Sequence, residues 1–454
     1  MRLAYLSPLP PRKSGISDYS AELLPHLASH FDVHPFSDEA GTVGGLTVRP
    51  YAEFAALASS GHFDAIVYQL GNNADYHARI HQLLLEYPGI VVLHEYMLHH
   101  LIQERTLSRG DLAGYLEELR YCYGDTGRDQ AQRALDTGIP IDRWSYPLFE
   151  RVIDRSLGAI VHNETTRRRV LASRPLAHVA TVPHHLALDA LPADRGAARR
   201  HFRSQWSIPD DAFVVATFGF ITPHKRIEVA LRAFAQLRQR YPKAMFVMAG
   251  EVSPFYDIQG ALGELGDSVL ATGRLDLPDL LSAMASCDVA VNLRYPTGGE
   301  TSGTSIRLLG LGTATIVSNS GSFAEIPDGC CAKVDLDERE EAVLAAYLER
   351  FASEPELGRR MGENARRHMT EHHTLKGSAR GYREFVEEIA ASGVEPFPAV
   401  PPLARSESVN TPAELIAGVS STVVDLGLDE RDEDVMRHVA GRIVELGFDH
   451  LGSN

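Results

Sequence analysis

A short loop rich in glycine and hydroxyl side chains carries the clearest chemical signal in this sequence. It spans residues 296–305, reads PTGGETSGTS, and follows an apolar, strand-like segment. Glycine has no Cβ, so such a loop can approach a ligand closely and point backbone N–H groups at phosphate oxygens. The apolar run 306–311 predicts a helix whose N-terminal dipole favours the same anion. The loop therefore predicts a site for a phosphorylated sugar, although a surface turn can have the same composition.

Glu300 is the one carboxylate of this loop. A carboxylate beside a phosphate would repel it, so we expect Glu300 to bind a sugar hydroxyl. The loop residues that we expect to bind the phosphorylated sugar are Gly299, Thr301, Ser302, Gly303, Thr304 and Ser305.

The composition is that of an acidic globular protein with two or three cores. Of the 454 residues, 44% are hydrophobic and 23% charged. A net charge of −16 argues against sequence-independent nucleic-acid binding and against a broadly basic membrane-docking surface. The arginine run 167–169 leaves membrane contact open without indicating it, since such a run is more often a solvated helix face.

Targeting and cysteine patterns predict a cytoplasmic protein. No apolar run reaches the roughly 18 residues that a membrane span needs, and prolines 8, 10 and 11 interrupt the segment where a signal peptide would be apolar. The four cysteines have the spacing of neither a disulfide framework nor a zinc site.

Short apolar runs alternate with amphipathic segments, which is typical of parallel sheets with crossover helices. The pattern predicts an α/β fold of two Rossmann-like, doubly wound domains facing each other across a cleft, with ligands at the carboxyl ends of the strands. Expected strands are 2–6, 65–68, 90–93, 158–162 and 179–182 in the first series, and 213–218, 244–249, 269–272, 289–292 and 315–318 in the second; expected helices include 227–240 and 277–285.

The amino-acid composition of the chain changes after about residue 392. The proline-rich segment 393–402 reads as an extended linker, and acidic segments with helical periodicity follow at 412–424 and 432–448. This tail could dock on the body, mediate self-association or be a poorly ordered appendage. The expected organisation is an N-terminal domain over 1–193, a connection over 194–211, a second domain over 212–392, and the linker with its acidic helical tail over 393–454.

Several segments, taken in order, resemble a known enzyme family. The chain is similar to retaining glycosyltransferases of the glycosyl-transferase group 1 class (family GT4), which have the GT-B fold, from Met1 to about Ala390. The matching segments are SGISDY at 14–19, FGFITPHKR at 218–226, GRL at 273–275, the run 299–313, and SGSFAE at 320–325.

The resemblance implies a hexosyltransferase that moves a sugar from a nucleoside-diphosphate sugar to a hydroxyl of a glycan or small molecule, with retention and without a metal. The first domain would bind the acceptor and the second the donor, a co-substrate rather than a cofactor. Lys225 would then supply the cation that stabilises the leaving diphosphate. Gly15 would allow close approach to the same group.

The sequence departs from the family pattern at two places. The family usually has an arginine where this chain has Phe220, so Arg226, Arg274 or backbone N–H groups would have to compensate. The two glutamates that the family carries in the donor loop fall on Gly299 and Arg307. Glu300 would replace the first by a shift of one residue, whereas ribose recognition has no carboxylate.

In the first domain, His94 resembles the family's histidine beside the transferred sugar, although a structural histidine is the alternative. Ser17, Asp18, Asn72 and Asn73 are candidates for acceptor binding. The spacing of Glu95, His99 and His100 would suit a metal, but no further ligand cluster is evident in the sequence, and we expect none.

Other functions remain open at this stage. A catalytically silent GT-B scaffold and a nucleotide-sugar hydrolase or epimerase are the alternatives to a transferase. A nucleotide-dependent oxidoreductase is disfavoured, because the residues after the first strand lack its glycine fingerprint. The nucleotide base, the sugar and the acceptor are not predicted.

Overall fold

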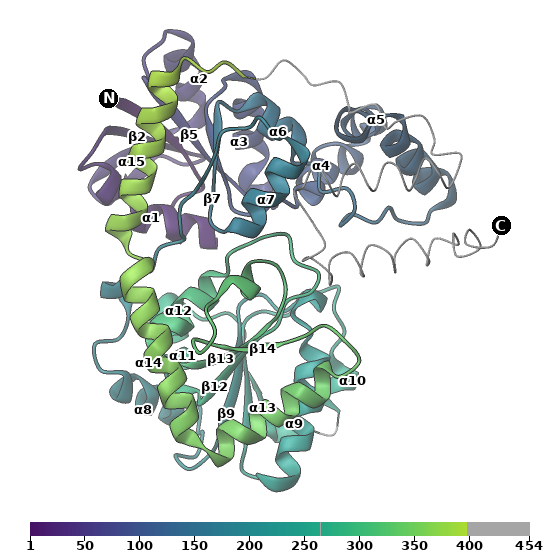
Figure 1. Cartoon of the computed structure of the whole chain (residues 1–454), viewed down its shortest axis with the longest axis vertical. Helices are drawn as coiled ribbons and strands as arrows, with labels where there is room; N and C mark the ends of the chain where they lie inside the picture. Colours follow the sequence, from purple (N-terminus) through teal and green to yellow (C-terminus); the bar gives the residue numbers. More distant parts are fainter. Residues whose placement is uncertain (264, 397–454) are drawn as a thin grey trace, which may run out of the picture. The chain divides into compact units, whose positions relative to one another are not determined.

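The computed structural model describes residues 1–263 and 265–396, which form two parallel sheets flanked by helices (Figure 1). The expected linker and acidic tail lie outside the described residues from 397 onward. The expected α/β fold with two Rossmann-like domains of the GT-B type is confirmed, and the expected strands are found with ends displaced by at most two residues. Within the described residues, no helix is both long and apolar enough to cross a bilayer.

The first sheet has the strand order β3-β4-β2-β1-β5-β6-β7-β8 and is parallel except for the β3–β4 hairpin. Its central strands are buried on both faces, which explains why they read as continuous apolar runs. The strands are β1 (Arg2–Leu6), β2 (Asp32–Ser37), β3 (Gly41–Val43), β4 (Leu46–Pro50), β5 (Ala65–Leu70), β6 (Ile90–Leu93), β7 (Gly158–Val161) and β8 (Val179–Thr181). Its helices are α1 (Gly15–Leu27), α2 (Tyr51–Ser59), α3 (Ala74–Glu86), α4 (His99–Arg105), α5 (Leu112–Thr137), α6 (Glu150–Arg155) and α7 (Glu164–Ser173).

The second sheet has the order β11-β10-β9-β12-β13-β14 and is parallel throughout. Its strands are β9 (Val214–Phe218), β10 (Met245–Ala249), β11 (Val269–Ala271), β12 (Val289–Asn292), β13 (Ala314–Ser318) and β14 (Ala332–Val334). Its helices are α8 (Arg195–Gln205), α9 (Ile227–Arg240), α10 (Gln259–Leu262), α11 (Leu277–Ser286), α12 (Gly303–Leu311), α13 (Glu340–Ser353) and α14 (Pro355–His372).

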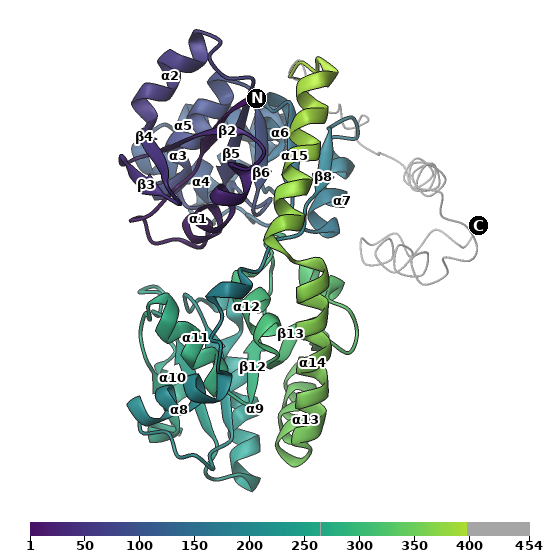
Figure 2. The same ribbon diagram turned by 90° about the vertical axis from the view of Figure 1, so that its left-hand side faces the viewer.

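Two segments pack differently from the expected organisation. Helix α8 lies in the expected connection, but its Phe202 is buried in the core beneath the second sheet. Helix α15 (Leu375–Ser392) ends the expected second domain, yet its apolar face, with Tyr382 and Phe385, packs in the core of the first sheet. Figure 2 shows α14 beside the second sheet and α15 beside the first. The chain therefore returns to the first domain, since α15 covers an apolar surface there.

Candidate functional site

The loops at the carboxyl ends of the strands enclose a cavity of about 290 Å³ between the two sheets. The first domain contributes the start of α1 and the loops after β5 and β6, and the second contributes the loop after β12 and the start of α12. The cavity is lined, among the residues expected from the sequence, by Gly15, Asn72, Asn73, His94, Glu300, Thr301 and Gly303.

Glu300 folds back onto its own loop and also faces the cavity. Its Oε2 accepts hydrogen bonds from the Gly298 backbone N–H at 2.8 Å and from Thr297 Oγ1 at 2.9 Å. Its Oε1 lies 3.4 Å from Nε of Arg294, which follows β12. Glu300 is thus a carboxylate held in one orientation at the cavity wall, where it can accept a hydrogen bond from a ligand.

A cationic corner lies at the second-domain side of the site. Lys225 is buried, its Nζ donates to the Phe218 carbonyl, and burial together with Arg294 lowers its pKa well below the ordinary value. Gly219 has φ of +80°, and a Cβ there would lie 3.0 Å from Lys225 Nζ and 3.6 Å from Thr304 Oγ1. Thr304 is in the first turn of α12, where backbone N–H groups lack helical partners. This corner can bind an anion.

His94 follows β6 and is held by a buried polar chain. Its Nε2 lies 2.7 Å from Gln69 Oε1, and the amide nitrogen of Gln69 donates to Tyr382 Oη on α15 at 3.3 Å. Because the amide oxygen must accept, His94 Nε2 carries the proton and Nδ1 is an acceptor. Burial lowers the pKa of His94 well below its usual value, so the ring is neutral.

Glu95 is a cavity residue that the sequence suggested only as a metal ligand. Its Oε1 accepts the Asn72 backbone N–H at 3.0 Å, and a Cβ on Gly298 would lie 3.4 Å from its Oε2. Burial and the nearby Glu300 raise the pKa of Glu95 to about 8, although the Asn72 bond and Arg294 act in the opposite direction. Two carboxyl groups, one from each domain, therefore face the same cavity.

Gly299 binds the first domain rather than the cavity. Its carbonyl accepts hydrogen bonds from Asn163 Nδ2 at 2.8 Å and Thr166 Oγ1 at 2.9 Å. Asn163 also donates to Thr301 Oγ1 at 3.0 Å, and the Tyr96 backbone N–H donates to the Gly298 carbonyl at 2.8 Å. The glycine loop is thereby joined to the first domain, so the expected role of Gly299 as a donor ligand is not supported by its position.

The two arginines expected beside the diphosphate have protein partners, and neither lines the cavity. Arg226 has φ of +52° and forms a bidentate ion pair with Glu340 on α13. Arg274 is at the rim, where its guanidinium lies 3.4 Å from the Lys13 carbonyl. Arg294, which the sequence analysis missed, is the arginine beside Lys225.

Several expected ligands cap helices at this edge of the sheets. Ser302 Oγ accepts the Ser305 N–H at the start of α12, and Asn73 Oδ1 accepts the Asp75 N–H at the start of α3. The side chain of Ser17 is buried in α1, and Ser305 Oγ accepts from Asn292 Nδ2 at 2.5 Å. Asn72 Oδ1 accepts the Leu101 N–H and Asp18 is exposed beside Arg307 and Arg274. Capping explains Ser302 and Asn73 without a ligand.

Two polar contacts between the domains flank the cavity. Arg307 on α12 lies 3.4 Å from Glu22 Oε1 on α1, whose other oxygen lies 3.1 Å from His185 Nε2. Glu325 accepts the backbone N–H groups of Glu164 and Thr165 at the start of α7, at 2.9 and 2.6 Å. Arg307, at the position where the family has its second glutamate, is thus paired with a carboxylate of the first domain.

The alternative metal ligands have other partners. His99 Nδ1 lies 2.6 Å from the Tyr146 carbonyl and Nε2 lies 2.8 Å from Tyr115 Oη, which occupies both ring nitrogens. Among residues 1–263 and 265–396, no group of three or more His, Cys, Asp or Glu side chains is arranged to hold a metal ion.

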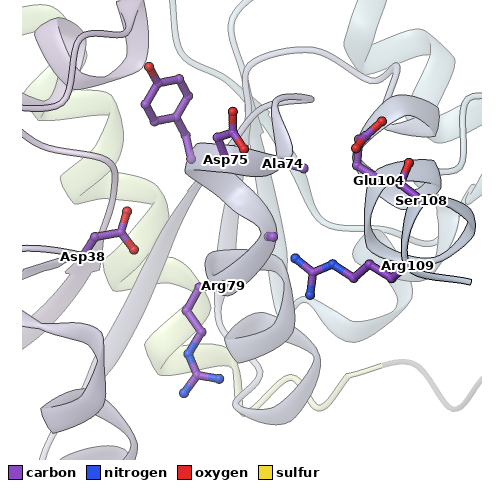
Figure 3. Close-up of a pocket in the computed structure, with 9 residues that line it drawn as sticks. Asp38, Ala74, Asp75, Arg79, Glu104, Ser108 and Arg109 are labelled. Atoms are coloured by element: carbon purple, nitrogen blue, oxygen red, sulfur yellow. The ribbon is translucent and has the colours of Figure 1, made fainter. Parts of the chain in front are cut away.

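A larger cavity of about 460 Å³ lies within the first domain. Figure 3 shows Asp38 on one side of α3 and Glu104, Ser108 and Arg109 on the other. Tyr76 lines both this cavity and the one between the domains. None of the residues expected to do chemistry lines the larger cavity.

Comparison with known proteins bears directly on the second domain. Residues 198–368 match the family described as Glycosyl transferases group 1. This segment runs from α8 to α14 and contains Lys225, Arg294, Glu300 and the start of α12.

Similar proteins and structures cover a larger part of the chain. An uncharacterized glycosyltransferase of Bacillus subtilis, YqgM, is 24% identical over 247 residues, which is 53% of this chain and 64% of that protein. Sucrose-phosphate synthase from Thermosynechococcus elongatus has a TM-score of 0.63 and 17% identity, with 86% of this chain and 99% of that chain covered. HepE of Anabaena, in complex with UDP-glucose, has a TM-score of 0.58 and 14% identity, with coverage of 86% and 100%. These structures share the fold.

Proposed function

We propose that this protein transfers a sugar from a nucleoside-diphosphate sugar to a hydroxyl acceptor. The observation that carries the proposal is that a cavity lined by hydroxyl-binding groups borders a corner of basic side chains, because Glu300, which lines the cavity, pairs with Arg294. Lys225, Arg294 and the start of α12 form a cationic corner in the second domain. His94 of the first domain and Glu300 of the second line the same cavity and offer acceptor atoms for hydroxyl groups. A nucleotide sugar has a matching division, with an anionic diphosphate and a neutral polyhydroxyl end.

The cationic corner would stabilise the leaving diphosphate. Negative charge accumulates on that group as the glycosidic bond breaks, so fixed cations and N–H dipoles lower the barrier if they are in place beforehand. Lys225 would exchange its bond to the Phe218 carbonyl for one to a phosphate oxygen, which would restore its charge. Arg294, already oriented by Glu300, would be the second cation.

Residues of the first domain would hold the sugar and the acceptor. Nδ1 of His94 would accept a hydrogen bond from a hydroxyl group of the ligand, since Nε2 already donates to Gln69. The acceptor would enter along the first-domain wall, where Asn72, Asn73 and Tyr76 line the cavity. We further propose retention of the anomeric configuration and no requirement for a metal; both rest on the resemblance of the second domain to group 1 glycosyl transferases.

Binding and product analysis test this function. Calorimetry with UDP, GDP, ADP and dTDP should find one nucleoside diphosphate that binds clearly more tightly than the others, and the same base should be preferred among nucleotide sugars. Incubation of that nucleotide sugar with pooled hydroxyl acceptors should yield a glycoside, with the anomeric configuration read by NMR. Transfer should persist in EDTA. Failure of every nucleoside diphosphate to bind would refute the proposal, and release of free sugar without any glycoside would indicate a hydrolase.

A further inference from the structure

Two carboxyl groups, Glu95 from the first domain and Glu300 from the second, line one cavity and approach the same glycine. Glu95 Oε2 and Glu300 Oε2 both approach Gly298: a Cβ there would lie 3.4 Å from the first and 3.6 Å from the second. The Tyr96 N–H bond to the Gly298 carbonyl fixes this approach, because it joins the loop after β6 to the glycine loop. The juxtaposition is thus built into the contact between the domains.

The hydrogen bonds divide the roles of the two carboxyl groups. Glu300 accepts two hydrogen bonds at Oε2 and lies beside Arg294 at Oε1, so each of its oxygens already has a donor or a cation next to it. Glu95 accepts one hydrogen bond, from Asn72, at Oε1, which leaves Oε2 as the oxygen that can carry a proton. A proton on Oε2 of Glu95 would point toward the cavity and toward Glu300.

The groups around Glu95 favour this protonation. Burial and Glu300 raise its pKa to about 8, so the acid form predominates at neutral pH. The guanidinium of Arg294 is near the pair and is already beside Glu300. His77 is buried and His94 is half-buried beside other histidines, and removal from water lowers the pKa of each, so neither adds a positive charge. Two further cations lie on this side of the site: Arg169 of α7, whose guanidinium lies 5.9 Å from the centre of the Tyr96 ring, and Arg307, which lines the cavity and pairs with Glu22.

We propose that Glu95 is a sugar-binding residue that shares one proton with Glu300. The two side chains, one from each domain, then bind hydroxyl groups of the transferred sugar. The inference rests on the proposed function. Glu95, as the acid, donates a hydrogen bond to one hydroxyl oxygen, and Glu300, as the carboxylate, accepts one from a hydroxyl proton. An arrangement of one donor and one fixed acceptor suits a neutral polyhydroxyl sugar.

Infrared spectroscopy of the free protein tests the shared proton without any ligand. At pH 7 the wild type should show a protonated-carboxyl C=O band that is absent from Glu95→Gln and present in Glu53→Gln, a control on the exposed surface of α2. The band should fade as the pH rises through about 8. An identical band in wild type and Glu95→Gln at pH 7 would overturn the proposal.

Calorimetry tests the contact with the sugar, using UDP and UDP-glucose, or the corresponding pair for whichever base the protein prefers. The ratio of the two affinities isolates the sugar contribution. In the wild type this contribution should fall about tenfold between pH 7 and 9, the upper end of what one hydrogen bond between neutral groups contributes, because the acid that donates it is then largely ionised. Glu95→Gln should keep it at both pH values, since the amide still donates, and Glu95→Leu should lose it at both.

The two proposals fail in different ways. An unchanged ratio in Glu95→Leu would remove Glu95 from the sugar site while leaving the proposed function intact. If no nucleotide of any base binds, the proposed function is refuted, and the sugar contact with it. The infrared measurement decides the protonation of Glu95 in either case.

Discussion

Substitution of Gly299 by alanine should separate the glycine loop from the first domain. Gly299 has φ of +80°, and a Cβ would lie 2.4 Å from Tyr96 Cδ1 and 2.5 Å from Thr166 Oγ1. Both distances are far below van der Waals contact, and both atoms belong to the first domain. The carbonyl of Gly299 would also move away from its donors, Asn163 and Thr166.

The expected cost has two parts. Holding alanine in the left-handed region costs about 1–2 kcal/mol, and forcing a methyl group into a packed contact costs about 1–3 kcal/mol more. Gly110 gives a matched control: its φ is +79°, and a Cβ there would meet nothing within 4 Å. Gly110→Ala should therefore show the backbone cost alone, and Gly299→Ala should show both.

Thermal unfolding by calorimetry measures the difference. A loss of 1 kcal/mol lowers the melting temperature of a domain of 150–250 residues by roughly 2–4 °C, so Gly299→Ala should melt about 2–12 °C below Gly110→Ala. Replacing Tyr96 by alanine in the Gly299→Ala background should recover part of the loss, because the nearest clashing atom is removed. Equal melting temperatures for the two single variants would refute the packing described for this loop.

Further measurements address the cationic corner and the core of the second domain. Lys225→Ala should lower transfer by at least about a hundredfold, whereas Lys243→Ala, on the exposed surface, should leave it unchanged; near wild-type transfer in Lys225→Ala would contradict its role. Because the lowered pKa of Lys225 should rise beside a diphosphate, nucleotide binding should take up protons and weaken as the pH rises; heats independent of the buffer's ionisation enthalpy would contradict this. Arg203 is buried and donates to the carbonyls of Ser286 and three other residues, so Arg203→Met should cost about 3–5 kcal/mol. Urea denaturation measures that loss against Arg200→Met, and equal stabilities would contradict it.

Strands buried on both faces could be predicted because they appear as uninterrupted apolar runs. β6, β9 and β12 are such strands, and each was expected close to its observed bounds. β2 was missed although it pairs with β1 near the middle of the sheet. Its sequence, DVHPFS, contains a proline opposite Tyr5, and proline lowers the expectation of a strand. The apolar run alone was too short to overcome that signal.

The surface against which α15 packs could not be predicted from its sequence. Its periodicity shows that one face is apolar, but many apolar surfaces could cover such a face. In the structure Phe385 approaches Gly158 of β7 so closely that a Cβ there would lie 2.8 Å from its ring. That fit depends on residues more than 200 positions apart. Local patterns contain no information about it.

The same limit applies to the site. The glycine loop and Lys225 could be predicted from composition and from their place after a predicted strand. Arg294 and Glu95 lie in comparable places, but their environment is created by other loops: Arg294 by Glu300, and Glu95 by Asn72 and the glycine loop. Gly299, which we expected to approach a ligand closely, lies close to Tyr96 in the structure.

The two departures from the family pattern have related explanations in this geometry. Phe220 is exposed, and Arg226 is paired with Glu340, so neither residue supplies the missing cation of the β9 loop. Arg294 lies beside Lys225 from the neighbouring strand β12 and offers a guanidinium to the same corner. Arg307 replaces a carboxylate but pairs with Glu22 of the first domain. In the proposed function, both changes shift contacts from the usual loop to its neighbours, and the basic corner still borders the hydroxyl-binding cavity through Glu300.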